Sequence, residues 1–128
     1  MNAMAALKQY QTVNTQVQVL DASPHRLIQM LMEGGLTRLA QAKGAIERGQ
    51  LTLKGDVLGK AIAIIGGLRS SLDLQNGGEL AHNLDSLYDY MIRRLSRANS
   101  SNDPALVEEV SSLLREIKSG WDGIADQI

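Results

Sequence analysis

The chain has 128 residues, 44% of them hydrophobic, with thirteen lysines and arginines against fourteen aspartates and glutamates. This length suits one domain, and the apolar fraction is enough to build a core. The near-neutral charge leaves no basic surplus to neutralise phosphates, which argues against nucleic-acid binding. Because the chain has no cysteine, disulfides and thiolate metal sites are excluded.

Neither a targeting signal nor a membrane span is predicted. Residues 1–11 lack the basic stretch followed by an apolar run that marks a secretory signal. The longest apolar stretch, residues 61–68, is far shorter than the ~20 residues needed to cross a bilayer. We therefore expect a soluble, cytoplasmic protein that does not insert into membranes.

Residues 1–22 show no regular hydrophobic pattern. The segment is polar and rich in glutamine, with scattered apolar side chains that include Leu7, Tyr10 and Val13. We interpret it as a flexible N-terminal arm in front of one domain that spans residues 23–128.

Two proline-containing pairs predict where helices begin. Ser and Asp are favoured N-caps, and Pro is tolerated at the first helical position. Ser23-Pro24 predicts the start of a first helix that ends near Gly49, and Asp103-Pro104 predicts the start of a last helix. In both, apolar residues recur every three or four positions, as on one face of a helix.

Two further helices are predicted between these. The second covers about residues 53–74 and ends at residues 75–78, because Asn and Gly accept the left-handed conformation that closes a helix. The third covers residues 79–98, with Leu80 among its inward residues, and a turn follows at residues 99–102. Four long helices with short connections predict an all-α, antiparallel up-and-down four-helix bundle.

The second helix has more apolar surface than one face requires. A bundle helix needs an apolar stripe about 100° wide, and Leu58, Ile62 and Ile65 widen that stripe on one flank. Two interpretations are open: a central helix contacted on two sides, or a groove for a partner helix. Seven glycines in the first two helices leave the same choice open between close helix contact and a shallow groove floor: Gly34, Gly35, Gly44, Gly55, Gly59, Gly66 and Gly67.

Glu79 and His82 form the one pair with spacing typical of a metal site. Di-iron bundles use two such Glu-x-x-His pairs together with further glutamates, whereas His25 has no matching glutamate here. Neither histidine is followed by the Lys-Gly pair of phosphorelay domains. We therefore expect no catalytic residue, metal or cofactor, and a metal-binding bundle enzyme stays an alternative.

Three stretches, in order over nearly the whole chain, carry a family pattern. The first is Tyr10 followed by residues 22–34, the second is residues 60–73, and the third is residues 77–99. Together they resemble the FliS family of flagellar export chaperones. Residues 32–33 depart from the pattern, since Met-Glu stands where Tyr-Asp is usual.

This resemblance implies a function. Proteins of the family are cytoplasmic helical bundles that bind the C-terminal segment of flagellin, prevent its premature polymerisation and assist its delivery to FlhA, the export gate protein of the flagellar type III apparatus. A chaperone that covers the amphipathic helices of flagellin removes them from assembly by mass action.

The resemblance also suggests which residues carry the function. Leu7, Tyr10 and Val13 are assigned to an arm that occupies the groove when no guest is bound. Asp85, Asp89 and Arg93 are candidates for either a polar rim or ordinary solvated surface. The flagellin-binding candidates, some of which must be core, are Leu58, Ile62, Ile65, Leu68, Leu72 and Tyr88.

A further alternative uses the same apolar surface. In a self-associating structural bundle, the wide stripe of the second helix would be a homodimer interface.

Overall fold

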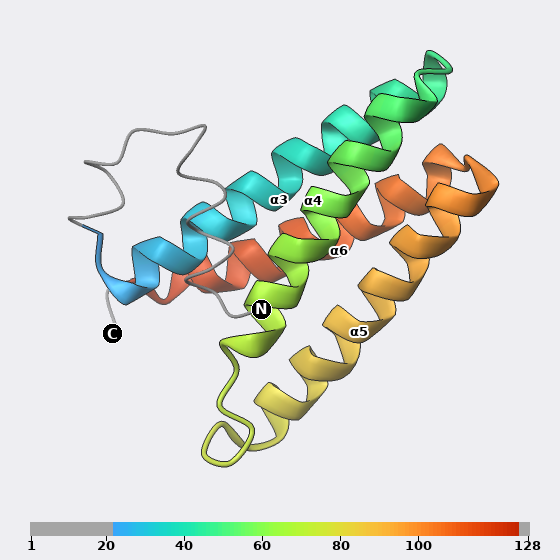
Figure 1. The fold of residues 1–128 in the computed structure, drawn as a ribbon. Coiled ribbons are helices and arrows are strands. Elements are labelled where there is room, and N and C mark those ends of the chain that lie inside the picture. The colour runs from blue at the N-terminus through green and yellow to red at the C-terminus, as the bar shows by residue number, and fades with distance from the viewer. Residues whose placement is uncertain (1–21, 126–128) are drawn as a thin grey trace.

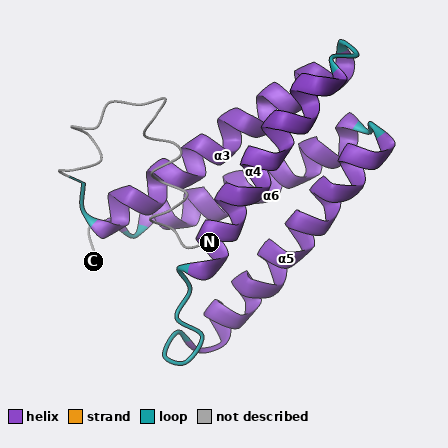
Figure 2. Cartoon of the chain, in the orientation of Figure 1, coloured by secondary structure: helices purple, strands orange, loops and turns teal. Residues whose placement is uncertain are grey.

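The computed structural model describes residues 22–125 and contains four α-helices in that part of the chain. They are α3 (Pro24–Glu47), α4 (Leu51–Ser70), α5 (Gly78–Ser101) and α6 (Pro104–Gly123). Consecutive helices run in opposite directions, and α3 and α5 each pack against both α4 and α6 (Figure 1). The predicted up-and-down four-helix bundle is therefore confirmed, and short connections join its helices (Figure 2).

Both predicted helix starts are confirmed by their caps. The Ser23 hydroxyl accepts a hydrogen bond from the Arg26 amide at 3.1 Å, with Pro24 in the first turn of α3. The Asp103 carboxylate accepts from the Ala105 amide at 2.9 Å at the start of α6. These bonds satisfy amide groups that have no partner within the helix.

The predicted bounds of the second helix were wrong at both ends. α4 begins at Leu51 and ends at Ser70, four residues before the predicted end at Leu74. In the connection that follows, an Asp73 carboxylate oxygen accepts from the amides of Gln75 (3.2 Å) and Asn76 (3.1 Å). Such a turn offers the backbone an alternative to helical hydrogen bonds, so the chain leaves the helix earlier.

The predicted turn at residues 99–102 was also wrong, because α5 continues to Ser101. Asn102 closes the helix in the left-handed conformation, with φ of 54°. The buried Lys54 amine of α4 donates to the Asn99 carbonyl (2.8 Å) and to Asn102 Oδ1 (2.5 Å). This contact stabilises the last turn of α5 from a distant part of the sequence.

The core lies along the middle of the bundle and is almost entirely aliphatic. Leu58 and Ile65 of α4 are 1% and 0% exposed, so the widened apolar stripe packs inward at these positions. The interpretation of α4 as a helix contacted on two sides therefore holds for these two residues. The largest fully buried side chains are Met30, Leu31, Leu39, Leu58, Ile65, Leu68, Met91, Leu95, Val107, Val110 and Leu114.

An apolar cavity at one end of the bundle

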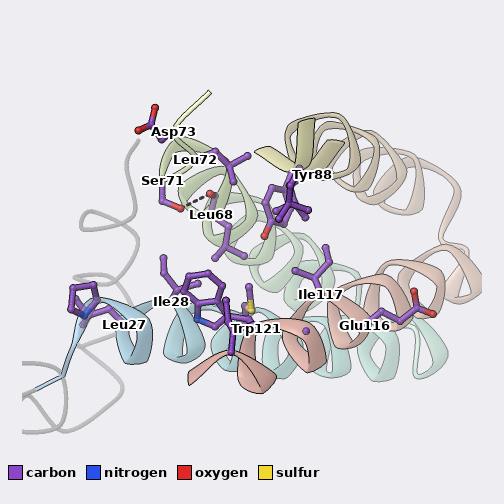
Figure 3. Close-up of a pocket in the computed structure, with 16 residues that line it drawn as sticks. Leu27, Ile28, Leu68, Ser71, Leu72, Asp73, Tyr88, Glu116, Ile117 and Trp121 are labelled. Atoms are coloured by element: carbon purple, nitrogen blue, oxygen red, sulfur yellow. Dashed lines mark hydrogen bonds between the residues drawn. The ribbon is translucent and has the colours of Figure 1, made fainter. Parts of the chain in front are cut away.

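A cavity of about 710 Å³ lies at one end of the bundle, lined by residues of all four helices and of the α4–α5 connection (Figure 3). The antiparallel topology brings together the first turns of α3 and α5 and the last turns of α4 and α6. Cavities of this size are typical of ligand and peptide sites. Its apolar lining residues are Pro24, Leu27, Ile28, Met32, Leu68, Leu72, Leu80, Leu84, Tyr88, Ile117, Trp121 and Ile124.

Leu80 shows that this end of the bundle is open. The sequence predicted that Leu80 points into the core, but 69% of its surface is exposed. Figure 1 shows the reason, since the first turns of α5 diverge from α3 and α6. Leu80 therefore belongs to the lining of an open cavity and not to the packed core.

The wall between α3 and α6 is held by a reciprocal contact of His25 and Trp121. The Trp121 indole nitrogen donates to the His25 carbonyl at 3.0 Å, and His25 Nε2 lies 2.7 Å from the Trp121 carbonyl. Because a carbonyl only accepts, Nε2 carries a proton in this arrangement. The two rings stack with centroids 4.7 Å apart, which fixes the orientation of the Trp121 indole beside the cavity.

The wall between α4 and α5 is held by ion pairs. Arg69 of α4 lies 2.7 Å from Asp85 and 3.1 Å from Asp89, and Asp89 is also 3.0 Å from Arg93. The hydrogen bond from Arg69 holds the pKa of the Asp85 carboxyl below its usual range. The three predicted rim residues of α5 thus form a chain of ion pairs that joins α5 to the end of α4.

Tyr88 is the residue of α5 that lies deepest in the cavity lining. Its side chain is 2% exposed and extends from α5 toward the cavity (Figure 3). Burial raises the pKa of Tyr88 to about 12, so its hydroxyl keeps its proton at neutral pH.

The six flagellin-binding candidates have different environments. Leu68, Leu72 and Tyr88 line the cavity, and Leu68 and Tyr88 are at the same time buried core residues. Leu58 and Ile65 are buried in the core and do not line the cavity. The remaining one, Ile62, is partly buried and packs against the core. Their assignment to a partner-binding surface stays a prediction.

The arm residues Leu7, Tyr10 and Val13 lie outside the described part of the chain, so their assignment also stays a prediction.

The half of the cavity that α3 and α6 supply was not predicted from the sequence. This half contains Leu27 and Ile28 on α3 and Ile117 and Trp121 on α6. A usable signal was present, because an up-and-down bundle places the start of its first helix next to the end of its last. Apolar residues at both places predict an apolar end once that topology is accepted.

Glu79 and His82 are both exposed near the start of α5. Among residues 22–125 there is no group of three or more His, Cys, Asp or Glu side chains that could hold a metal ion. The helices of this described part are also too short or too polar to span a membrane.

A helical bundle with an open apolar cavity belongs to the class of proteins that hold an apolar ligand or partner segment. Residues 6–128 match the family described as flagellar protein FliS. The chain is 66% identical to the flagellar secretion chaperone FliSB of Pseudomonas aeruginosa, over 98% of this chain and 99% of the relative. It is 46% identical to FliS of Vibrio cholerae (93% and 88% covered) and 45% identical to FliS of Salmonella typhimurium (98% and 93% covered).

The chain belongs to the FliS family of flagellar secretion chaperones. This confirms the resemblance seen in the sequence. The family is one of chaperones and not of enzymes, so the metal-dependent enzyme is no longer an alternative.

Proposed function

We propose that this chaperone binds the C-terminal segment of flagellin in the cytoplasm, prevents its premature polymerisation, and assists its delivery to the export gate protein FlhA. Family membership supports a role in flagellar export. The observation that carries the proposal further is the apolar cavity, which is large enough for the side chains of a guest helix.

The lining of the cavity suits an amphipathic helix. Leucine, isoleucine and tryptophan side chains line the cavity from all four helices, and Leu80 keeps most of its surface exposed. Apolar surface removed from water contributes roughly 25 cal/mol per Å². A guest that covers Leu80 and fills the cavity therefore gains free energy that the free chaperone does not have.

Binding of this kind also explains a chaperone's action. A segment held by the chaperone is withdrawn from filament assembly by mass action. A guest that folds only when it binds loses conformational entropy, so its net affinity is lower than its contact area suggests. Moderate affinity suits a complex that must release its guest at the export gate.

Calorimetric titration with a flagellin C-terminal segment tests the proposal. We expect saturable binding with a negative heat-capacity change, because apolar surface is buried. Both partners are used at tens of micromolar, far above the Kd that corresponds to about 8 kcal/mol of binding free energy. If the titration then shows no heat and the two proteins do not co-elute, the proposal is contradicted.

Size-exclusion chromatography with light scattering separates this function from self-association. We expect the chaperone and the flagellin segment to elute together with the mass of a complex, and we expect this complex to bind FlhA. A homodimer whose mass is unchanged by flagellin would favour the structural bundle instead.

A further inference from the structure

The cavity is apolar inside and acidic at its edge. Among the described residues that line it, the only charged side chains are Asp73, on the α4–α5 connection, and Glu116, on α6. Figure 3 shows these two carboxylates on opposite sides of the apolar lining. No described lysine or arginine lines the cavity.

The cations nearest this end of the bundle are already paired. Arg26 lies 3.0 Å from Glu33, Arg69 lies 2.7 Å from Asp85, and Lys118 lies 2.7 Å from Asp122. Their charges are compensated by these partners, so they do not offset the carboxylates at the cavity edge.

The carboxylates at the edge have no cationic partner among the residues that the structure describes. Within residues 22–125, neither Glu116 nor Glu79, which precedes the cavity residue Leu80, has a hydrogen bond or ion pair, and both are exposed. Asp73 bonds only to groups of its own turn, and its hydrogen bonds with Asn76 hold the pKa of its carboxyl below the usual range. Among the described residues, the mouth of the cavity therefore presents carboxylates that no lysine or arginine offsets.

The Tyr88 hydroxyl adds a polar point inside the cavity. The side chain is 2% exposed, and its hydroxyl has no hydrogen-bond partner in the described part of the chain. No side-chain nitrogen or oxygen of the described residues is both fully buried and without a hydrogen-bond partner, so this hydroxyl is not an unsatisfied buried group. A guest that supplies an acceptor or a donor at this point adds a hydrogen bond that the free chaperone does not make within the described part of the chain.

From these features we propose that the cavity is specific for an amphipathic helix that carries one hydrogen-bonding group for Tyr88 among its apolar side chains, and lysine or arginine at its edge for Glu116 and Asp73. This inference rests on the proposed function, whose guest it describes chemically. The apolar lining supplies most of the affinity, while Tyr88 and the carboxylates select which helix binds and in which register.

Tyr88→Phe tests the polar point, with Tyr90→Phe as the matched control on the same helix. Tyr90 donates to Glu109 at 2.7 Å and does not line the cavity, so its variant should lose stability but not binding. Tyr88→Phe should keep its thermal stability and bind the flagellin segment about fivefold more weakly, as expected for one lost hydrogen bond. Equal or tighter binding by Tyr88→Phe would show that the guest makes no such bond.

Glu116→Gln tests the acidic edge, with Glu47→Gln as its control. Both glutamates are exposed, but Glu47 is the last residue of α3, at the opposite end of the bundle. At low salt we expect Glu116→Gln to bind the flagellin segment about threefold more weakly than the unmodified protein, and Glu47→Gln to bind it equally well. At high salt the difference between the two variants should disappear, because exposed charges are screened. Binding that is independent of salt and equal in both variants would overturn the electrostatic part.

A synthetic pair of helices separates failure of this inference from failure of the proposed function. Two peptides of about 18 residues, or five turns, carry the same leucine stripe with either lysines or glutamates along its edge. Trp121, the one tryptophan of the chain, lines the cavity and reports binding by its fluorescence. We expect the lysine peptide to bind at least tenfold more tightly than the glutamate peptide. Equal affinities of the two peptides refute the inference even if flagellin binds. A preference for the lysine peptide supports the inference even if flagellin does not bind.

Discussion

Gly35 and Gly59 both lie inside helices but have different surroundings. A Cβ atom on Gly35 would lie 3.1 Å from Leu114 Cδ2 and 3.4 Å from Ile64 Cγ2. A Cβ atom on Gly59 would meet no atom within 4 Å. The glycine of α3 therefore permits close contact with α4 and α6, whereas Gly59 has no packing role among the described residues.

Replacing each glycine by alanine should separate these two environments. We expect Gly59→Ala to raise the free energy of unfolding by about 0.5–1 kcal/mol, because glycine in a helix is conformationally costly. Gly35→Ala should give no such gain, because Leu114 must move to admit the new methyl group. Urea denaturation followed by circular dichroism measures both changes, and equal stabilisation of the two variants would contradict the packing described.

Between elements, Arg69 joins α4 to α5 beside the cavity through Asp85 and Asp89, and its contact with Asp85 is the shorter one. Its guanidinium nitrogens lie 2.7 Å and 3.4 Å from the two carboxylate oxygens of Asp85. The pKa of Asp85 is lowered in the folded protein by this bond. A lowered pKa means that the folded state favours the ionised carboxylate, so the contribution to stability exists above the unfolded pKa and is lost in acid.

Asp85→Asn should therefore be less stable than the unmodified protein at neutral pH. The difference should be constant above pH ~4, near the pKa of an unfolded aspartate, and should shrink as the pH falls through the lowered folded pKa. Denaturation midpoints measured across this range test the expectation. A difference that stays the same down to the most acidic pH would mean that the Arg69 contact does not stabilise the fold.

Helix starts were predictable because their causes are local. Ser23-Pro24 and Asp103-Pro104 contain both the capping side chain and the proline that fits the first turn. The end of α5 was not predictable in this way, because Lys54 stabilises it from another helix. A window of neighbouring residues contains no sign of that contact.

For the molecule as a whole, the topology was predictable and the site only in part. Leu68, Leu72 and Tyr88 were singled out from the stripes of two helices, and all three line the cavity. Ile65 belongs to the same kind of stripe but does not line the cavity. Periodicity identifies an apolar face, but it does not say at which point along the bundle that face stops being covered.

The charged residues add an asymmetry along the bundle that the net charge conceals. Unpaired carboxylates gather at the cavity end, where Glu79 and Glu116 are exposed. In the C-terminal half of α5, by contrast, Arg93, Arg94 and Arg97 lie around a second, polar depression, where Arg93 pairs with Asp89 and Arg94 with Glu109. A cationic guest would be attracted to the cavity end, which favours one orientation during encounter.

The most direct test of flagellin binding at this cavity is amide hydrogen exchange, measured with and without the flagellin C-terminal segment. Bound guest should slow exchange in residues 71–77, in the first turns of α3 and α5, and in the last turns of α6, because these segments surround the cavity and open less often when it is filled. If protection is confined to α4 around residues 55–66, where Gly55, Gly59 and Gly66 have no packed neighbour, the account of the site is contradicted. An absence of protection anywhere would contradict it as well.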